Sequence, residues 1–186
     1  MQRFHAEFRA EMTGDTLAGY AAVFGPVAKL ARSYERLAPT AFDDALAKGA
    51  DVRALVNHDP SKLLARTSSG TLKLGTDSHG LHFEAQLPNT SYANDLRELV
   101  ARGDLNSMSF GFVPGKQQMS TAPNGAQLRT HTSLAQLLDV SPVTFPAYEG
   151  TEVSLRSDWE WDEETTRSKL VRARARVHIN THKDNK

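Results

Sequence analysis

The sequence contains a series of short apolar segments, each ended by turn residues, and this pattern limits the folds that the chain can adopt. Segments of about four to eight residues that are bounded by Gly, Pro, Asn or Asp are typical of β-strands. Strands are predicted at residues 19–24, 52–57, 71–74, 81–87, 107–113, 128–132 and 137–144. Asp77, Ser78 and Gly80 lie between two of them and predict a β-hairpin, and residues 123–125 predict another loop.

Two predicted helices interrupt the strands. The first covers residues 41–48, with Thr40 as its N-cap and Gly49 at its C-terminal end. The second covers residues 91–102, has one apolar face and ends at Gly103. Many short strands with two inserted helices favour a mostly β fold of the α+β type. We expect a closed or nearly closed β-barrel with peripheral helices.

Composition narrows the class of protein. With 186 residues, the chain can form one full hydrophobic core but not two large ones. It contains no Cys, which excludes disulfides, a thiol nucleophile and a Cys-based zinc site. No apolar run approaches the ~20 residues of a membrane-spanning helix, and the N-terminal segment lacks the apolar stretch of a signal peptide. The formal net charge is zero, which gives no reason to expect nucleic acid as a partner. Together these features predict a soluble intracellular protein that does not bind a membrane.

The distribution of charge sets off the last part of the chain. Residues 158–164 are acidic, whereas residues 167–186 contain seven Lys or Arg and one acid, Asp184. The alternation of apolar and turn residues that is typical of a folded domain is confined to residues 1–156. We therefore predict one domain followed by a charged tail at 157–186. The tail is either a solvated, flexible extension or a docking or processed segment.

Two segments contain a candidate serine nucleophile and a candidate histidine base. In the segment NSMSFGF, alternation places Ser107, Ser109 and Gly111 on one face of a strand and larger apolar side chains on the other. Such a face of small residues is open to a substrate backbone. His58 follows the apolar run ALVN, at the exit of a predicted strand. A serine hydroxyl needs a base to take its proton, so His58 and a serine of this face form a candidate pair.

The pattern leaves alternatives open at each of these positions. Small residues also relieve crowding in a barrel, His58 fits an ordinary loop, and alternation does not separate Ser107 from Ser109. Asp139 interrupts the apolar segment LLDVSPV, and a buried carboxylate there needs a donor, which can be a histidine N–H, an arginine or solvent. His79 and His82 form an HxxH pair, but they straddle a predicted turn without a third ligand, so no metal site is expected.

Six short motifs occur in order along residues 19–156. They are GYAAVFG, YERLAPTAFDDAL, ALVNHDPSKLLART, TLKL with GLHFEAQLP, LVARGDLNSMSFGF and LLDVSPVTFPAYEGTEV. Together they resemble the prohead (head-maturation) protease family of tailed phages. The resemblance implies that residues 1–156 are a serine endopeptidase domain related in fold to the herpesvirus assembly protease, a β-barrel surrounded by helices.

The resemblance also implies the roles of individual residues. The family histidine falls on His58 and the family serine on Ser109. The family's acidic position before Val-Ser falls on Asp139, whereas the herpesvirus enzymes use a second histidine, for which His131 is the candidate. By analogy with those enzymes, Arg129 is a candidate donor to the oxyanion. No metal or cofactor is implied.

Substrates and partners follow from the same resemblance. The expected substrates are the scaffold protein and the N-terminal segment of the major capsid protein, cleaved inside the immature prohead in the host cytoplasm, with self-cleavage. The herpesvirus relatives make a homodimer or higher oligomer an expectation. The alternatives are a non-catalytic capsid- or scaffold-binding assembly protein and a barrel that binds nucleic acid through its basic tail.

Overall fold

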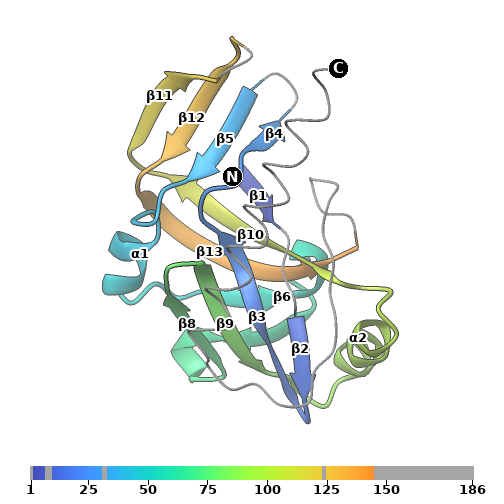
Figure 1. Ribbon diagram of the computed structural model, residues 1–186. Helices are drawn as coiled ribbons and strands as arrows, with labels where there is room; N and C mark the ends of the chain where they lie inside the picture. Colours follow the sequence, from blue (N-terminus) through green and yellow to red (C-terminus); the bar gives the residue numbers. More distant parts are fainter. Residues whose placement is uncertain (1, 7–9, 31–32, 123–124, 145–186) are drawn as a thin grey trace, which may run out of the picture.

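The computed structural model describes residues 2–6, 10–30, 33–122 and 125–144, most of them in strands (Figure 1). A five-stranded sheet has the order β1 (Gln2–Ala6), β10 (Ser107–Pro114), β13 (Leu134–Val143), β6 (Arg53–Leu55) and β7 (Leu63–Arg66). A second sheet has the order β11 (Gln117–Thr121), β12 (Gln127–His131), β5 (Ser33–Leu37) and β4 (Ala28–Leu30). A third has the order β2 (Ala10–Thr13), β3 (Thr16–Val23), β9 (Gly80–Gln86) and β8 (Leu72–Thr76).

The mostly β, α+β character predicted from the sequence is confirmed, but the expected closed barrel is not found. A barrel requires hydrogen bonding to continue from strand to strand through a full circuit. In the described part of the chain, strand pairing stops at two edge strands in each of the three sheets. Register shifts at Gly111/Phe112 in β10 and at Tyr20/Ala22 in β3 interrupt two of the ladders. Such irregularities bend strands, and β10 and β3 belong to different sheets.

The hairpin predicted around Asp77 is confirmed as β8 and β9. Its turn forms because one carboxylate oxygen of Asp77 accepts hydrogen bonds from the backbone N–H groups of His79 and Gly80, at 2.7 and 2.9 Å. The strand predicted at 52–57 is shorter than expected and ends at Leu55, since the next residues turn away from the sheet. Six strands lie in segments where periodicity predicted none, namely β1, β2, β4, β5, β7 and β11.

Both predicted helices are present, as α1 (Asp43–Ala47) and α2 (Ser91–Ala101), with short 3₁₀ turns η1 (Val56–His58) and η2 (Thr67–Ser69). The predicted cap of α1 is wrong, because the Thr40 hydroxyl donates to the carbonyl of Thr132 instead. In α2, Leu96 and Val100 are buried, whereas Leu99 is 38% exposed.

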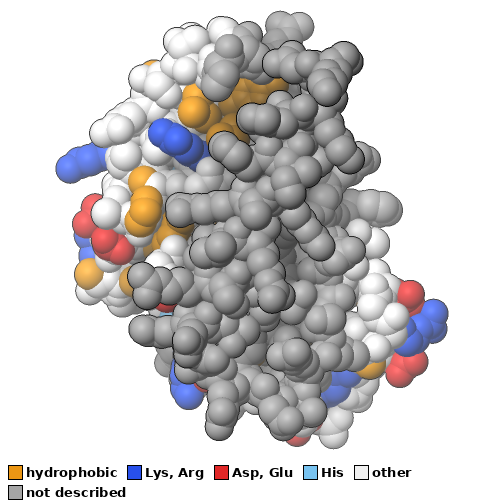
Figure 2. Space-filling view, in the orientation of Figure 1, with side chains coloured by type: hydrophobic (Ala, Val, Ile, Leu, Met, Phe, Trp, Pro, Cys, Tyr) orange, Lys and Arg blue, Asp and Glu red, His pale blue; other side chains and the backbone are white. Residues whose placement is uncertain are grey.

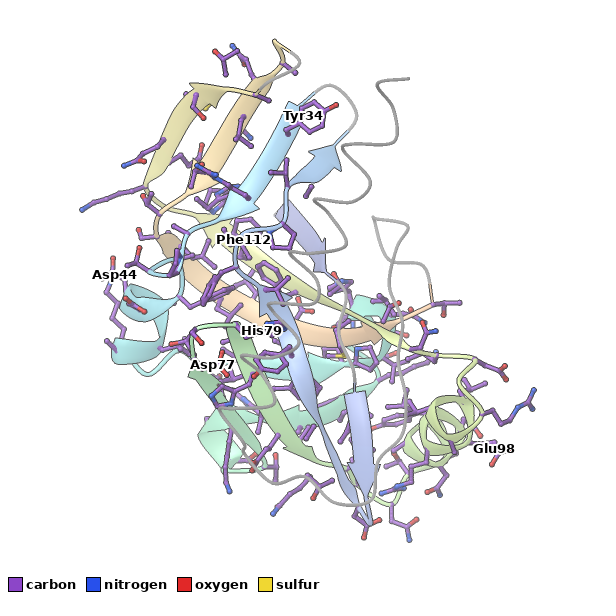
Figure 3. All side chains as sticks on the ribbon, viewed as in Figure 1. Tyr34, Asp44, Asp77, His79, Glu98 and Phe112 are labelled. Atoms are coloured by element: carbon purple, nitrogen blue, oxygen red, sulfur yellow. The ribbon has the colours of Figure 1, made fainter. Side chains whose placement is uncertain are left out.

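The core is built around aromatic residues of β10 and Phe42, the residue just before α1. Phe42, Phe110 and Phe112 are fully buried. The ring centroid of Phe110 lies 5.4 Å from that of Phe42 and 5.3 Å from that of Phe112. Phe112 lies near the middle of the molecule (Figure 3). The alternation predicted for β10 is therefore correct on this side, because its large apolar side chains are core residues. This packing fixes β10, the strand that also carries the candidate serine.

On the face in Figure 2, the described residues that are visible include Lys and Arg as well as Asp and Glu side chains. No helix in the described segments has both the length and the apolar character that crossing a bilayer demands. The charged tail predicted at 157–186 lies outside the described residues.

Candidate active site

Three neighbouring strands of the five-stranded sheet supply the candidate residues. Ser109 lies in β10, opposite Ser141 of β13 in the antiparallel ladder. Asp139 is two residues before Ser141, so its side chain is on the same face of the sheet. β6 runs parallel to β13 and leads directly into the turn that carries His58. Residues far apart in the chain thus meet on one face of a single sheet.

The turn at His58 has an unusual backbone. Asn57 and His58 have φ angles of 52° and 58°, and they are the two non-glycine residues with positive φ in the described chain. Asn is among the residues that adopt this left-handed conformation most readily, whereas other side chains adopt it at a cost. The two left-handed residues reverse the chain after β6 and bring the imidazole to the β10 and β13 side chains.

A continuous chain of hydrogen bonds joins the three predicted residues. The imidazole Nε2 of His58 is 2.7 Å from the hydroxyl of Ser109, and its Nδ1 is 2.5 Å from Oδ1 of Asp139. An ionised carboxylate only accepts hydrogen bonds, so the neutral imidazole carries its proton on Nδ1. Nε2 is then the acceptor for the Ser109 hydroxyl. A base that accepts from the nucleophile and is oriented by a carboxylate is the arrangement of a serine peptidase.

The candidate site is buried, contrary to the expectation of an open face. The His58 and Asp139 side chains are 3% and 5% exposed, and Ser109 is fully buried. One reason is that the imidazole itself packs on the serine. A buried carboxylate requires donors, and Asp139 has two, since the Ser141 hydroxyl donates to Oδ1 at 2.7 Å.

The structure distinguishes between the alternatives that the sequence left open. The Ser107 hydroxyl donates to the side chain of Asn106 at 3.0 Å, whereas Ser109 is hydrogen-bonded to the imidazole. Asp139, and not His131, is the partner of His58. His131 lies in β12 of the second sheet.

The other two candidate residues, His131 and Arg129, both contact Glu35 in a separate cluster. Glu35 of β5 is 1% exposed and accepts hydrogen bonds from His131 at 2.9 Å and from Arg129 at 2.8 Å. The Arg129 guanidinium is paired with Glu35 of the neighbouring strand, and its expected role as a donor to the oxyanion stays a prediction. Glu35 was missed by the sequence analysis, and the acidic residue inside the segment YERL was the available signal.

His79 lies near Asp77 in the turn of the β8–β9 hairpin (Figure 3), and His82 follows in β9. Their rings contact Tyr20 edge-on, with centroids 4.5 and 6.4 Å away, and the Tyr20 hydroxyl donates to Asp77 at 2.5 Å. Burial lowers the pKa of both histidines, and the Asp77 charge opposes this. Within the described ranges, no cluster of three or more His, Asp or Glu side chains is arranged to hold a metal ion.

Comparison with known proteins places this arrangement in a family. The model of the caudovirus prohead serine proteases matches residues 4–164, and the chain belongs to this family. The prohead protease of Enterobacteria phage HK97 is 31% identical over 150 residues, which cover 77% of this chain and 62% of the relative. The chain thus spans less than two thirds of the length of that relative. No solved structure matches the chain.

Proposed function

We propose that this chain is a serine endopeptidase of phage prohead maturation in which Ser109 is the nucleophile, His58 the general base and Asp139 the group that orients the base. The hydrogen-bonded series Ser109–His58–Asp139 carries the proposal. Its chemistry fits a family described as serine proteases. The likeness to the herpesvirus assembly protease fold belongs to this proposal as well.

The geometry supplies each proton transfer that peptide hydrolysis requires. His58 Nε2 takes the proton of the Ser109 hydroxyl as the oxygen attacks the peptide carbonyl, and the carboxylate of Asp139 stabilises the resulting imidazolium. His58 then gives that proton to the nitrogen of the leaving amine, and the C–N bond breaks to leave an acyl-enzyme. Water attacks the ester with His58 again as base, and the proton returns to the Ser109 oxygen.

The proposed substrates are the scaffold protein and the N-terminal segment of the major capsid protein, and the enzyme also cleaves itself. The name of the HK97 relative, prohead protease, supports a place of action inside the immature head. We further propose that the tail at 157–186 docks the enzyme in the prohead or is removed during maturation, and that the active form is a homodimer or higher oligomer.

Co-expression with the major capsid protein of the same phage tests the function. Mass spectrometry of the capsid protein should show a shortened N-terminus with the wild-type chain and an intact one with Ser109→Ala, since loss of a serine nucleophile costs about 10⁶-fold in rate. Ser107→Ala is the matched control, because Ser107 lies on the same strand face but contacts Asn106. It should retain processing.

Two outcomes would overturn the proposal. Processing by Ser109→Ala at the wild-type rate would exclude this serine as nucleophile. Stable binding of capsid protein or scaffold by the wild-type chain with no cleavage of either would favour the non-catalytic assembly protein. Circular dichroism of each variant must match the wild type, so that loss of processing reports on chemistry and not on folding.

A further inference from the structure

The turn that carries His58 is tied to the strand that carries Asp139 by a pair of polar side chains. The backbone N–H of Thr144 donates to Oδ1 of Asn57 at 2.9 Å, and Nδ2 of Asn57 lies 3.3 Å from the Thr144 hydroxyl. Thr144 directly follows β13. We call these contacts the Asn57–Thr144 bridge. It joins two residues that are 87 positions apart in the chain.

From this geometry we infer that Asn57 is a positioning residue for the proposed base, His58. The inference rests on the proposed function, because it concerns how the imidazole is held against Ser109 and Asp139. Asn57 is not itself a catalytic residue. It is exposed, and its side chain is hydrogen-bonded to Thr144.

The backbone explains why such a bridge is needed. His58 has a left-handed conformation that histidine adopts infrequently, and it directly follows another left-handed residue. A turn of this kind persists only when neighbouring contacts hold it. The imidazole must also keep two hydrogen bonds at once, 2.7 Å to Ser109 and 2.5 Å to Asp139. A small rotation of the turn would lengthen at least one of them.

The position of the bridge adds a second argument. Asp139 and Thr144 belong to one continuous segment of chain, β13 and the residue after it. The turn therefore contacts this segment twice. The His58 ring bonds to Asp139, and the side chain of Asn57 bonds to Thr144. Two attachments to one strand fix the orientation of the turn better than one, because they remove the freedom to pivot about the first contact.

The substitution Asn57→Gly isolates the bridge from the backbone conformation. Glycine adopts positive φ without cost, so this variant keeps the turn and loses the carboxamide. Asn57→Asp is the rescue variant, because its carboxylate still accepts from the Thr144 N–H. Asn89→Gly is the matched control: Asn89 precedes α2 and accepts a hydrogen bond from Asn94.

The probe is a fluorophosphonate reagent, which modifies an activated serine and needs no knowledge of the natural substrate. The labelling rate of Ser109 in the full chain should fall about 10- to 100-fold in Asn57→Gly, since a displacement near 1 Å can cost about that much. Asn57→Asp should recover most of the loss and Asn89→Gly should match the wild type. The low-field proton resonance of His58 Nδ1–H, assigned by its absence in His58→Ala, should broaden or disappear in Asn57→Gly.

The outcomes separate this inference from the proposed function. Absence of Ser109 labelling in the wild type, together with absence of capsid-protein processing, would defeat the function itself. If the wild type is labelled, and Asn57→Gly is labelled at the same rate with an unchanged His58 resonance, the inference alone is overturned. A fall in melting temperature with labelling of the folded protein unchanged would assign the bridge a purely structural role, which also overturns it.

Discussion

The most informative single change is Asp139→Asn, because it removes a charge while keeping the size of the side chain. In the wild type, Oδ1 of Asp139 accepts from His58 Nδ1 and from the Ser141 hydroxyl. The asparagine amide can turn its oxygen toward these two donors, in which case only the charge is lost. It can also turn its NH₂ toward His58, which places the ring proton on Nε2. The imidazole then cannot accept the Ser109 proton.

The size of the effect follows from the burial of the pair. Both side chains are at most 5% exposed, so the attraction between carboxylate and imidazolium is only weakly screened. Two unit charges about 4 Å apart in an effective dielectric of about 20 attract by about 4 kcal/mol. Loss of that term alone slows the reaction about 10³-fold, and the wrong tautomer brings the total to about 10⁴-fold.

Fluorophosphonate labelling of Ser109 and cleavage of the capsid protein measure this loss independently. Asp95→Asn is the matched control, since Asp95 is an exposed residue of α2. The reasoning is refuted if folded Asp139→Asn is labelled within 10-fold of the wild-type rate. A loss in His131→Gln equal to that in Asp139→Asn, with both proteins folded, would point to His131 as the third member.

Three further predictions concern the surroundings of the site and the stability of the fold. Ser141→Ala should lower the Ser109 labelling rate about 10-fold, because a hydrogen bond to a charged group is worth ~1.5–3 kcal/mol; an unchanged rate contradicts this. Glu35→Ala should lower the free energy of unfolding by about 1–3 kcal/mol in urea titration, since it removes the acceptor to which His131 and Arg129 donate, while the folded fraction keeps its labelling rate. Burial lowers the pKa of His79 and His82, so the unfolded chain binds protons that the folded chain does not, and stability should fall as the pH drops below about 6.5. The double variant His79→Gln/His82→Gln should flatten this slope in thermal melts, and an equally steep slope would sink the assignment.

The sequence alone was sufficient for those features that depend on neighbours in the chain. The alternation in NSMSFGF separated core side chains from the serine face, and the hairpin at Asp77 followed from its turn residues. Ser141 could also have been found, because it lies two residues after Asp139 on the same strand face. The family motifs pointed to His58, Ser109 and Asp139 for the same reason: each lies within a short segment of recognisable pattern.

Only the tertiary structure decided which of these residues meet. The choice of Ser109 over Ser107, and of Asp139 over His131, depends on strand order and register, which place β6 beside β13 and β12 beside β5. Strand order also determines that the described strands form three open sheets and not one closed barrel. Pairings between distant segments are selected by the packing of the whole core and by the closing of long loops, and no local pattern encodes that balance. The left-handed turn at Asn57 and His58 is likewise hydrogen-bonded to residues more than 80 positions away in the chain.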